Sequence, residues 1–491
     1  MTQLLHSSHL HTCSCSFRNQ NREKQTSMAQ LHPISTFTLL FLTTLLSSFV
    51  ISHSQPLLSP AEQASVYRVL DSLNPHVPWR TLFPDDLCSY GPHGVVCDFF
   101  ANDTDPSVVT VHVSELSFGY VSDYTPNPPC SSTATLSPLL FTSFPYLRKL
   151  FFYRCFNETT VVSVPDIPAS FGSGLEELVF IDNPSLVSPL SGILRNFTSL
   201  RRAVLTGNGF YGNVPDSVAE MVHLEELTLS GNQLGGEIPV SFEKLKKLKV
   251  LDLGGNSFAG KVPDSVGSLS ELLKLDLSSN GFSGKIPESL KNLRRLELLD
   301  LSYNRFNNSG VPLFLSEMTQ LRTVSLSGNL LGGQIPEIWS KLGGILGIGL
   351  SGMGLVGKIP ASMGVYLRNV RYLGLDNNKL EGTVPQEFGL LESVNEINLE
   401  NNSLSGRVSF SSAKFGHKMK LYGNPQLCVD DKGLRFAKGL GFEELKVCSK
   451  QQKPNSAHFT MDSSSSSAVQ VVVPSMVMVC GFLGMIVLML N

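Results

Sequence analysis

Three aspartates, Asp252, Asp276 and Asp300, recur at equal intervals in the middle of this 491-residue chain. Carboxylates stacked at one spacing could bind a cation or act together in acid–base catalysis. Each lies between two leucines, so in neighbouring strands the three would share one face, about 4.8 Å apart at the backbone. Because aspartate is common between the leucines of such a pattern, we interpret the three as a solvated polar row.

Motifs of the main catalytic classes do not occur in the sequence. It has no Gly-x-Ser-x-Gly, His-Glu-x-x-His or Gly-x-x-x-x-Gly-Lys-Ser/Thr motif, and no Cys-x-x-Cys pair. We therefore predict a protein that is not an enzyme, without catalytic residues, cofactor or metal. The net charge of −3, with no block of five like charges, gives no reason to expect a nucleic-acid partner.

The element that carries the aspartates repeats along the chain. Nine asparagines stand 24 or 25 residues from one another, except at one double step where Met353 takes the intervening position. Each lies in the same frame of apolar residues, for example Leu248-x-x-Leu251-x-Leu253-x-x-Asn256-x-Phe258. This frame is the leucine-rich repeat, in which each coil has a short strand and a return segment. We expect the asparagine side chains to bond backbone groups between coils. The nine are Asn183, Asn208, Asn232, Asn256, Asn280, Asn304, Asn329, Asn378 and Asn402.

The repeats predict the architecture. Eleven repeats run from Leu147 to Val408, and a twelfth, irregular one includes Val111 to Phe118. We predict an α/β solenoid, a superhelix with disulfide-bonded caps whose parallel strands form a concave sheet. The predicted domains are an N-terminal extension with signal peptide (1–54), a cap (55–106), the solenoid (107–410), a second cap (411–450), a polar stalk (451–470) and a hydrophobic anchor (471–491).

Export is indicated at both ends of the chain. Phe37 to Val50 fits the core of a signal peptide, and Met28 offers an alternative start that would make residues 1–27 a gene-model extension. Val471 to Leu490 is uncharged and long enough for a membrane helix, or for the cleaved signal of a glycolipid anchor. Both alternatives place the protein at the outer face of the plasma membrane. Five sequons predict glycosylation: Asn102, Asn157, Asn196, Asn307 and Asn401.

Six cysteines lie between these two ends, an even number that predicts disulfides in a secreted chain. Cys88 and Cys97 precede the repeats, and Cys428 and Cys448 follow them, where a solenoid must cap its core. We predict a bond within each pair. Cys155 occupies the asparagine position of its repeat, so it either fills that position or bonds with Cys130, and we favour the bond.

The return segments add a pattern that resembles a known class. Leu-x-Gly-x-Ile-Pro is similar to the plant-specific leucine-rich repeat, Trp79-x8-Cys88-x8-Cys97 to the N-terminal cap of plant receptor ectodomains, and Gly423-Asn424-Pro425-x-x-Cys428 to their C-terminal cap. The chain thus resembles plant receptor-like proteins without a kinase domain, in the group that includes Too Many Mouths and the Piriformospora indica-insensitive proteins. This resemblance implies work beside receptor kinases. The predicted Asn102–Pro129 junction is longer than the usual cap.

Two stretches of the predicted concave face differ from the rest. Apolar residues near the start could form an exposed partner site, unless the 102–129 segment folds over them. Farther along, Gly347 and Gly349 leave a bare surface that could be an interface or a degenerate repeat. The candidate partner-binding residues are Phe151, Tyr153, Val179, Ile181 and Val204 in the first stretch, and Arg322, Leu346, Arg371 and Tyr372 in the second.

The function predicted from these features is recognition at the cell surface. The chain would bind a secreted peptide, a microbial ligand or a receptor-kinase ectodomain in plant signalling. The alternative is an extracellular inhibitor of microbial wall-degrading enzymes, of the polygalacturonase-inhibitor type, which the same repeat also resembles. A diffusible inhibitor needs no membrane anchor, so the apolar tail favours the first hypothesis.

Overall fold

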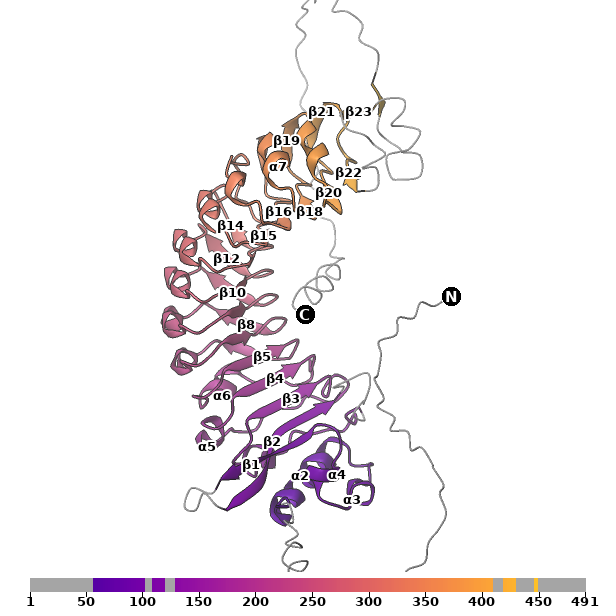
Figure 1. Ribbon diagram of the computed structural model, residues 1–491, viewed down its shortest axis with the longest axis vertical. Helices are drawn as coiled ribbons and strands as arrows, with labels where there is room; N and C mark the ends of the chain where they lie inside the picture. The colour runs from indigo at the N-terminus through magenta and orange to yellow at the C-terminus, as the bar shows by residue number, and fades with distance from the viewer. Residues whose placement is uncertain (1–55, 102–107, 120–128, 409–417, 430–445, 449–491) are drawn as a thin grey trace, which may run out of the picture.

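The computed structural model describes residues 56–101, 108–119, 129–408, 418–429 and 446–448. Strands and return segments stack coil upon coil into a curved solenoid, with the strands of the largest sheet along its inner side and short helices on the outer side (Figure 1). The predicted leucine-rich-repeat solenoid is therefore confirmed. The predicted signal peptide and the apolar tail lie outside the described residues.

The largest sheet has fourteen strands, and all its neighbours pair in parallel except β1 and β2, which are antiparallel. In spatial order the strands are β1 (Val95–Ala101), β2 (Val109–Gly119), β3 (Lys149–Tyr153), β4 (Glu177–Ile181), β5 (Arg202–Thr206), β7 (Glu226–Thr228), β9 (Val250–Asp252), β11 (Lys274–Asp276), β13 (Leu298–Asp300), β15 (Thr323–Ser325), β16 (Gly347–Gly349), β18 (Tyr372–Gly374), β20 (Glu396–Asn398) and β22 (Met419–Lys420).

Two smaller parallel sheets form in the return segments, which the sequence analysis did not predict. One contains β14 (Arg305–Phe306), β12 (Gly281–Gly284), β10 (Ser257–Gly260), β8 (Gln233–Gly236) and β6 (Tyr211–Asn213). The other contains β17 (Val356–Lys358), β19 (Lys379–Gly382), β21 (Ser403–Arg407), β23 (Gln426–Val429) and β24 (Lys446–Val447).

Short helices complete the coils. The α-helices are α2 (Pro60–Leu73), α3 (Trp79–Leu82), α4 (Leu87–Tyr90), α5 (Ala169–Gly172), α6 (Leu190–Leu194) and α7 (Ala361–Tyr366). The 3₁₀ helices are η1 (Pro138–Phe141), η2 (Asp216–Glu220), η3 (Val240–Lys244), η4 (Asp264–Ser268), η5 (Glu288–Asn292), η6 (Leu313–Glu317), η7 (Trp339–Lys341) and η8 (Gln386–Leu390).

Glycine and proline of the return pattern set the path of each coil. Gly236, for example, has φ +77°, a left-handed conformation that side chains with a Cβ disfavour. Three residues later Pro239, with φ −60°, precedes η3 as its cap. Between them Ile238 is buried in the continuous core. The same three roles recur in later coils, which bend alike as a result.

The asparagine ladder, formed by the nine repeated asparagines, joins neighbouring coils as predicted. The Asn280 Oδ1 accepts the backbone N–H of Phe258 at 3.0 Å, and its Nδ2 donates to the carbonyl of Leu253 at 2.9 Å. Met353 occupies an asparagine position, and its own N–H and that of Leu355 both donate to Asn378 Oδ1 of the next coil at 3.0 Å. Each side chain satisfies buried backbone groups that no strand pairing reaches.

Disulfides link the six cysteines as Cys88–Cys97, Cys130–Cys155 and Cys428–Cys448, the pairs that we predict from the sequence. Cys155 combines the two alternatives. It keeps the asparagine position of its coil, where its N–H donates to Asn183 Oδ1 at 2.8 Å, and its sulfur bonds Cys130.

The N-terminal cap covers the first coil with α2. Ser59 caps this helix by accepting the N–H of Glu62. The buried Glu62 carboxylate accepts the N–H of Val113 at 2.9 Å and lies 2.9 Å from His112 Nδ1. Both partners belong to β2, so this one side chain ties the cap to the solenoid.

Candidate functional site

Parallel register aligns the residues of the inner sheet into rows that run along the solenoid. We define the edge row as the residues just before the strands, which hydrogen bonds between successive coils connect: Arg148, Glu176, Arg201, Glu225, Lys249, Leu273, Glu297, Arg322, Leu346 and Arg371. The second row is Glu115, Lys149, Glu177, Arg202, Glu226, Val250, Lys274, Leu298, Thr323, Gly347, Tyr372 and Glu396.

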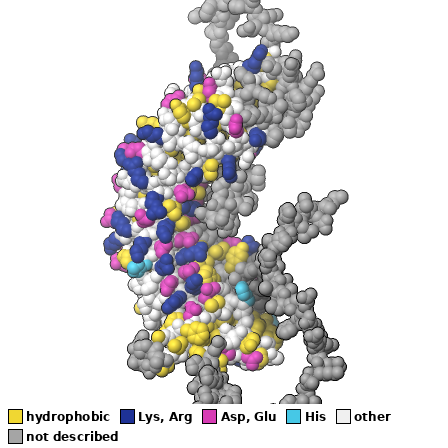
Figure 2. All heavy atoms as spheres, in the orientation of Figure 1, with side chains coloured by type: hydrophobic (Ala, Val, Ile, Leu, Met, Phe, Trp, Pro, Cys, Tyr) yellow, Lys and Arg dark blue, Asp and Glu magenta, His cyan; other side chains and the backbone are white. Residues whose placement is uncertain are grey.

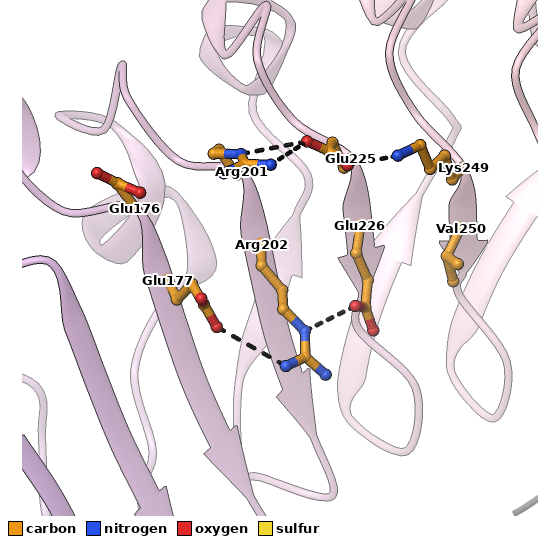
Figure 3. A pocket seen from close by; sticks show the side chains of 8 residues that line it. All are labelled: Glu176, Glu177, Arg201, Arg202, Glu225, Glu226, Lys249 and Val250. Carbon is orange, nitrogen blue, oxygen red and sulfur yellow. Dashed lines mark hydrogen bonds and ion pairs between the residues drawn. The ribbon is translucent and has the colours of Figure 1, made fainter. Parts of the chain in front are cut away.

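Charges alternate along both rows in the N-terminal half of the solenoid (Figure 3). In the edge row the Glu225 carboxylate lies 2.7 Å from Arg201 and 2.6 Å from Lys249. Hydrogen bonds from Lys249 and Arg201 lower the pKa of Glu225 to about 2. In the second row Arg202 lies 2.7 Å from Glu226 and 3.8 Å from Glu177.

These side chains line a shallow hollow of about 250 Å³. The cations and carboxylates that line the hollow already neutralise one another. Figure 2 shows positively and negatively charged side chains intermingled over the middle coils. Sequence reasoning missed this charge lattice, although the alternation of Glu and Arg at one position of successive repeats was a readable signal. Because its charges are paired, the lattice offers an incoming ion no unmatched partner.

The prediction of a solvated aspartate row is wrong for Asp252 and Asp276, whereas Asp300 is partly exposed. Asp252, Asp276 and Asp300 do stand in register, but Asp252 and Asp276 are only 7% and 9% exposed. The Lys274 ammonium lies 2.8 Å from Asp252 and 3.8 Å from Asp276. Neighbouring strands bring these side chains so close that they cover one another, which sequence alternation alone does not reveal. In the described part of the chain, no cluster of His, Cys, Asp and Glu could hold a metal ion.

The aspartate row makes stability depend on pH. Burial, followed by repulsion from Asp252 and Asp300, raises the pKa of Asp276 from its ordinary value of 3.8 to about 6. The folded state therefore retains a proton that the unfolded state has lost between these values, and stability falls as pH rises through this window. Asp276→Asn removes this penalty and should stabilise the protein by about 1–3 kcal/mol at pH 7.

Thermal unfolding at pH 7 and pH 3.5 tests this expectation. The gain should nearly vanish at pH 3.5, where Asp276 is protonated in the folded state and about two-thirds protonated in the unfolded state. Asp264→Asn, at an exposed aspartate one coil away, serves as the control and should leave the midpoint unchanged at both values. An equal gain at both pH values would show that the raised pKa is not the cause.

The first candidate patch is less exposed than predicted. Val179 and Val204 are 5% and 6% exposed, so the prediction of an exposed apolar group is wrong for these two. Val179 lies in register between Phe151 and Val204, and such flanking contributes to its burial. Phe151, Tyr153 and Ile181 are partly exposed. Residues 102–107 and 120–128 of the segment that was the alternative cover for this patch lie outside the described residues.

Apolar side chains gather instead at the N-terminal end of the face that Figure 2 shows. Phe99, Val96 and Val109 of the β1–β2 pair are exposed. Phe100 packs against His112 and Tyr146 at ring distances of 5.8 and 4.6 Å. This apolar end is not evident from the sequence, because the first coil departs from the repeat frame.

The second candidate patch is assembled by the fold. Arg322, Leu346 and Arg371 follow one another in the edge row, and Tyr372 stands beside Gly347 in the second row. Arg322 and Arg371 are exposed, whereas Leu346 is partly exposed. Burial, with nearby Asp376 and Glu396, raises the pKa of Tyr372 to about 12, so its hydroxyl stays protonated at neutral pH.

The predicted glycosylation sites lie on different parts of the coils. Asn157, Asn307 and Asn401 are exposed, and Asn196 is partly buried with its Nδ2 donating to the carbonyl of Ile167. Asn102 lies outside the described residues. Glycosylation stays a prediction for all five.

Comparison with known proteins agrees with the repeats. The family model described as "Leucine-rich repeat region" matches residues 183–335, and that described as "Leucine Rich Repeat" matches residues 369–391. In overall shape the chain is similar to the solved PEPR1–AtPEP1 complex, with a TM-score of 0.57 and 24% identity over 75% of this chain and 52% of that one. That likeness shows a shared fold.

Three Arabidopsis thaliana proteins are similar in sequence. Piriformospora indica-insensitive protein 2 is 36% identical over 26% of this chain, Receptor like protein 29 is 31% identical over 32%, and Protein TOO MANY MOUTHS is 34% identical over 32%. The chain spans 28%, 31% and 29% of the lengths of these relatives. The chain is therefore a leucine-rich-repeat solenoid protein and, across the matched region, a homologue of plant leucine-rich-repeat receptor-like proteins.

Proposed function

We propose that the chain is a non-catalytic recognition protein at the extracellular face of the plasma membrane, which binds a ligand or a receptor-kinase ectodomain through its concave sheet. Its similarity to Receptor like protein 29 supports this role. A receptor of the same fold, the HAESA ectodomain, is known in complex with a peptide hormone. We carry this kind of partner over to the chain as an analogy of fold.

The observation that carries the proposal is a change of chemistry along the concave face. From Arg148 to Lys249 the edge row is a lattice of paired charges. Toward the C-terminus the same row presents exposed arginines, and a partly exposed tyrosine lies beside them. Arginine and tyrosine are enriched among the residues that dominate binding energies at interfaces. The recognition surface therefore lies in the C-terminal coils.

Membrane display rests on the sequence of the two ends. Among the residues that the structure describes, no helix is both long and apolar enough to cross a bilayer, and Val471 to Leu490 lies outside them. Truncation before Asn455 should release the protein into the medium. Release of the full-length form by a phospholipase specific for inositol lipids would indicate a glycolipid anchor, and retention would indicate a spanning helix.

Capture of membrane partners tests the recognition role. The tagged full-length chain, expressed in plant cells, should co-purify with a receptor-kinase ectodomain. Tyr372→Ala should weaken this capture by about 30-fold, the effect of losing about 2 kcal/mol at an interface anchor. Tyr211→Ala, which removes an exposed tyrosine from β6 in another sheet, should not. Capture of a wall-degrading enzyme in place of a kinase would instead support the inhibitor hypothesis.

A further inference from the structure

Two arginines of the edge row differ from the other cations in it. Arg201 and Lys249 each bind Glu225, and Arg148 lies 3.9 Å from Glu176. Within the described ranges, no ion pair or side-chain hydrogen bond engages Arg322 or Arg371. Glu297, the neighbour of Arg322 in the row, is exposed and forms no ion pair with it there. These two guanidinium groups are therefore available to an anionic ligand.

Stacking of the coils fixes the spacing of the two arginines. The Leu346 N–H donates to the carbonyl of Arg322 at 2.6 Å, and the Arg371 N–H donates to the carbonyl of Leu346 at 2.7 Å. Arg322 and Arg371 thus lie two coils apart. At about 4.8 Å per coil, their backbones are separated by about 10 Å along the solenoid.

The surface between them is apolar and low. Leu346 lies between the two arginines, and Gly347 follows it in the second row. A Cβ on Gly347 would lie 3.3 Å from Thr323 Cγ2, closer than ordinary packing, so glycine keeps this position free of a side chain beside Thr323. The Tyr372 side chain leans over Gly374 of its own strand, where a Cβ would lie 2.7 Å from the tyrosine hydroxyl, and this hydroxyl is hydrogen-bonded to Ser351.

Two anionic groups about 10 Å apart on one side of an extended peptide favour one extended conformation over another. In a polyproline II helix, three residues make one turn with a rise of about 3.1 Å each, so residues i and i+3 share one side about 9 Å apart. In a β-strand residues i and i+3 point to opposite faces, and i and i+2 are only about 7 Å apart. A polyproline II segment therefore matches the arginine spacing better.

We propose that Arg322, Leu346, Gly347, Arg371 and Tyr372 form a docking site for an acidic peptide segment in polyproline II conformation, with two carboxylates three residues apart. Each carboxylate pairs with one guanidinium group, which can bind it through two parallel hydrogen bonds. Prolines between the carboxylates pack on Leu346 and the Tyr372 ring, as proline-rich segments do on aromatic grooves. This inference rests on the proposed function, since it assigns a ligand class to the same surface.

The test measures binding of a fluorescent Gly-Glu-Pro-Pro-Glu-Gly peptide to the purified full-length chain in detergent. Arg322→Gln and Arg371→Gln should each weaken binding by about 10- to 100-fold, the usual cost of a charged hydrogen bond. Arg201→Gln, a change of the same type in the charge lattice, should leave binding unaltered. Because Arg322 and Arg371 are exposed, their variants should melt at the wild-type temperature.

Altered peptides test the spacing. Replacing both glutamates by glutamine should abolish binding, and Glu-Pro-Glu or Glu-Pro-Pro-Pro-Pro-Glu spacings should weaken it by about 10-fold or more. Lack of binding to the wild-type chain, equal binding of all spacings, or full binding by Arg371→Gln would each overturn the proposal.

A parallel capture experiment separates this inference from the proposed function. The Arg322→Gln/Arg371→Gln double variant is compared with the wild type for co-purification of receptor kinases from plant membranes. Kinase capture by the wild type together with absence of peptide binding would overturn the peptide site and leave the recognition role standing. If the wild type binds the peptide but captures no kinase, the proposal of a receptor-kinase partner is overturned and the peptide site stands.

Discussion

Leu277→Asp is expected to prevent accumulation of the folded protein at the cell surface. Leu277 is fully buried, and the groups around it are the apolar frame residues of the neighbouring coils. Loss of a buried leucine side chain costs about 2–5 kcal/mol, and a buried carboxylate without a partner adds several kcal/mol more. The sum is comparable to the whole stability of a typical domain, about 5–15 kcal/mol.

Surface level and secretion of the variant give the readout. Ser270→Asp introduces the same charge at an exposed position seven residues earlier and should reach the surface at the wild-type level. If Leu277→Asp accumulated as well as Ser270→Asp, the assignment of Leu277 to the interior would be wrong. Retention of both variants would point to general sensitivity of this coil to charge.

Asn329→Leu should have the second largest effect, because it removes a bridge between coils. Asn329 is fully buried, its Nδ2 donates to the carbonyls of Leu301 and Leu326 at 2.9 Å, and its Oδ1 accepts the N–H of Phe306 at 3.1 Å. Leucine has a similar volume but leaves these backbone groups unpaired. At about 1–3 kcal/mol for each of the three unpaired groups, we expect a loss of about 3–9 kcal/mol.

Denaturant unfolding measures this loss, and hydrogen exchange at the Phe306 amide locates it. Exchange at that amide should accelerate more than in distant coils, because each repeat contacts mainly its neighbours. Asn292→Leu makes the same substitution at an exposed asparagine at the end of η5 and should be nearly neutral. Equal destabilisation by the two variants would contradict a specific role for the asparagine ladder.

Repetition explains why so much of the fold could be predicted. A residue that recurs every 24 or 25 positions must serve the same role in each coil, so Leu277 and Asn329 could be placed inside without a structure. The cysteines outside the repeats could be paired because each pair lies at one end of the solenoid. Domain limits, glycosylation and the membrane anchor stay predictions, since the comparisons and the described residues do not test them.

Side chains of different coils come into contact only when the coils stack, so the sequence pattern did not predict which of them bury one another. Asp276 reads as a surface residue from its alternation with leucine, yet Lys274 and the neighbouring aspartates enclose it. Val179 is covered in the same manner, with Phe151 and Val204 beside it in the row. Strand spacing of about 4.8 Å creates such crowding between residues far apart in sequence.

The sequence by itself determined the repeat, its buried leucine positions, the asparagine ladder and the cysteine pairs of the two caps, because these depend on local periodicity and on position relative to the solenoid ends. The tertiary structure decided which charges of the concave face are satisfied. Arg201 and Arg322 occupy the same position of their repeats and each has a glutamate one coil away, but among the described residues only Arg201 forms an ion pair with a carboxylate. That difference depends on side-chain geometry, and it distinguishes the paired half of the surface from the half open to a partner.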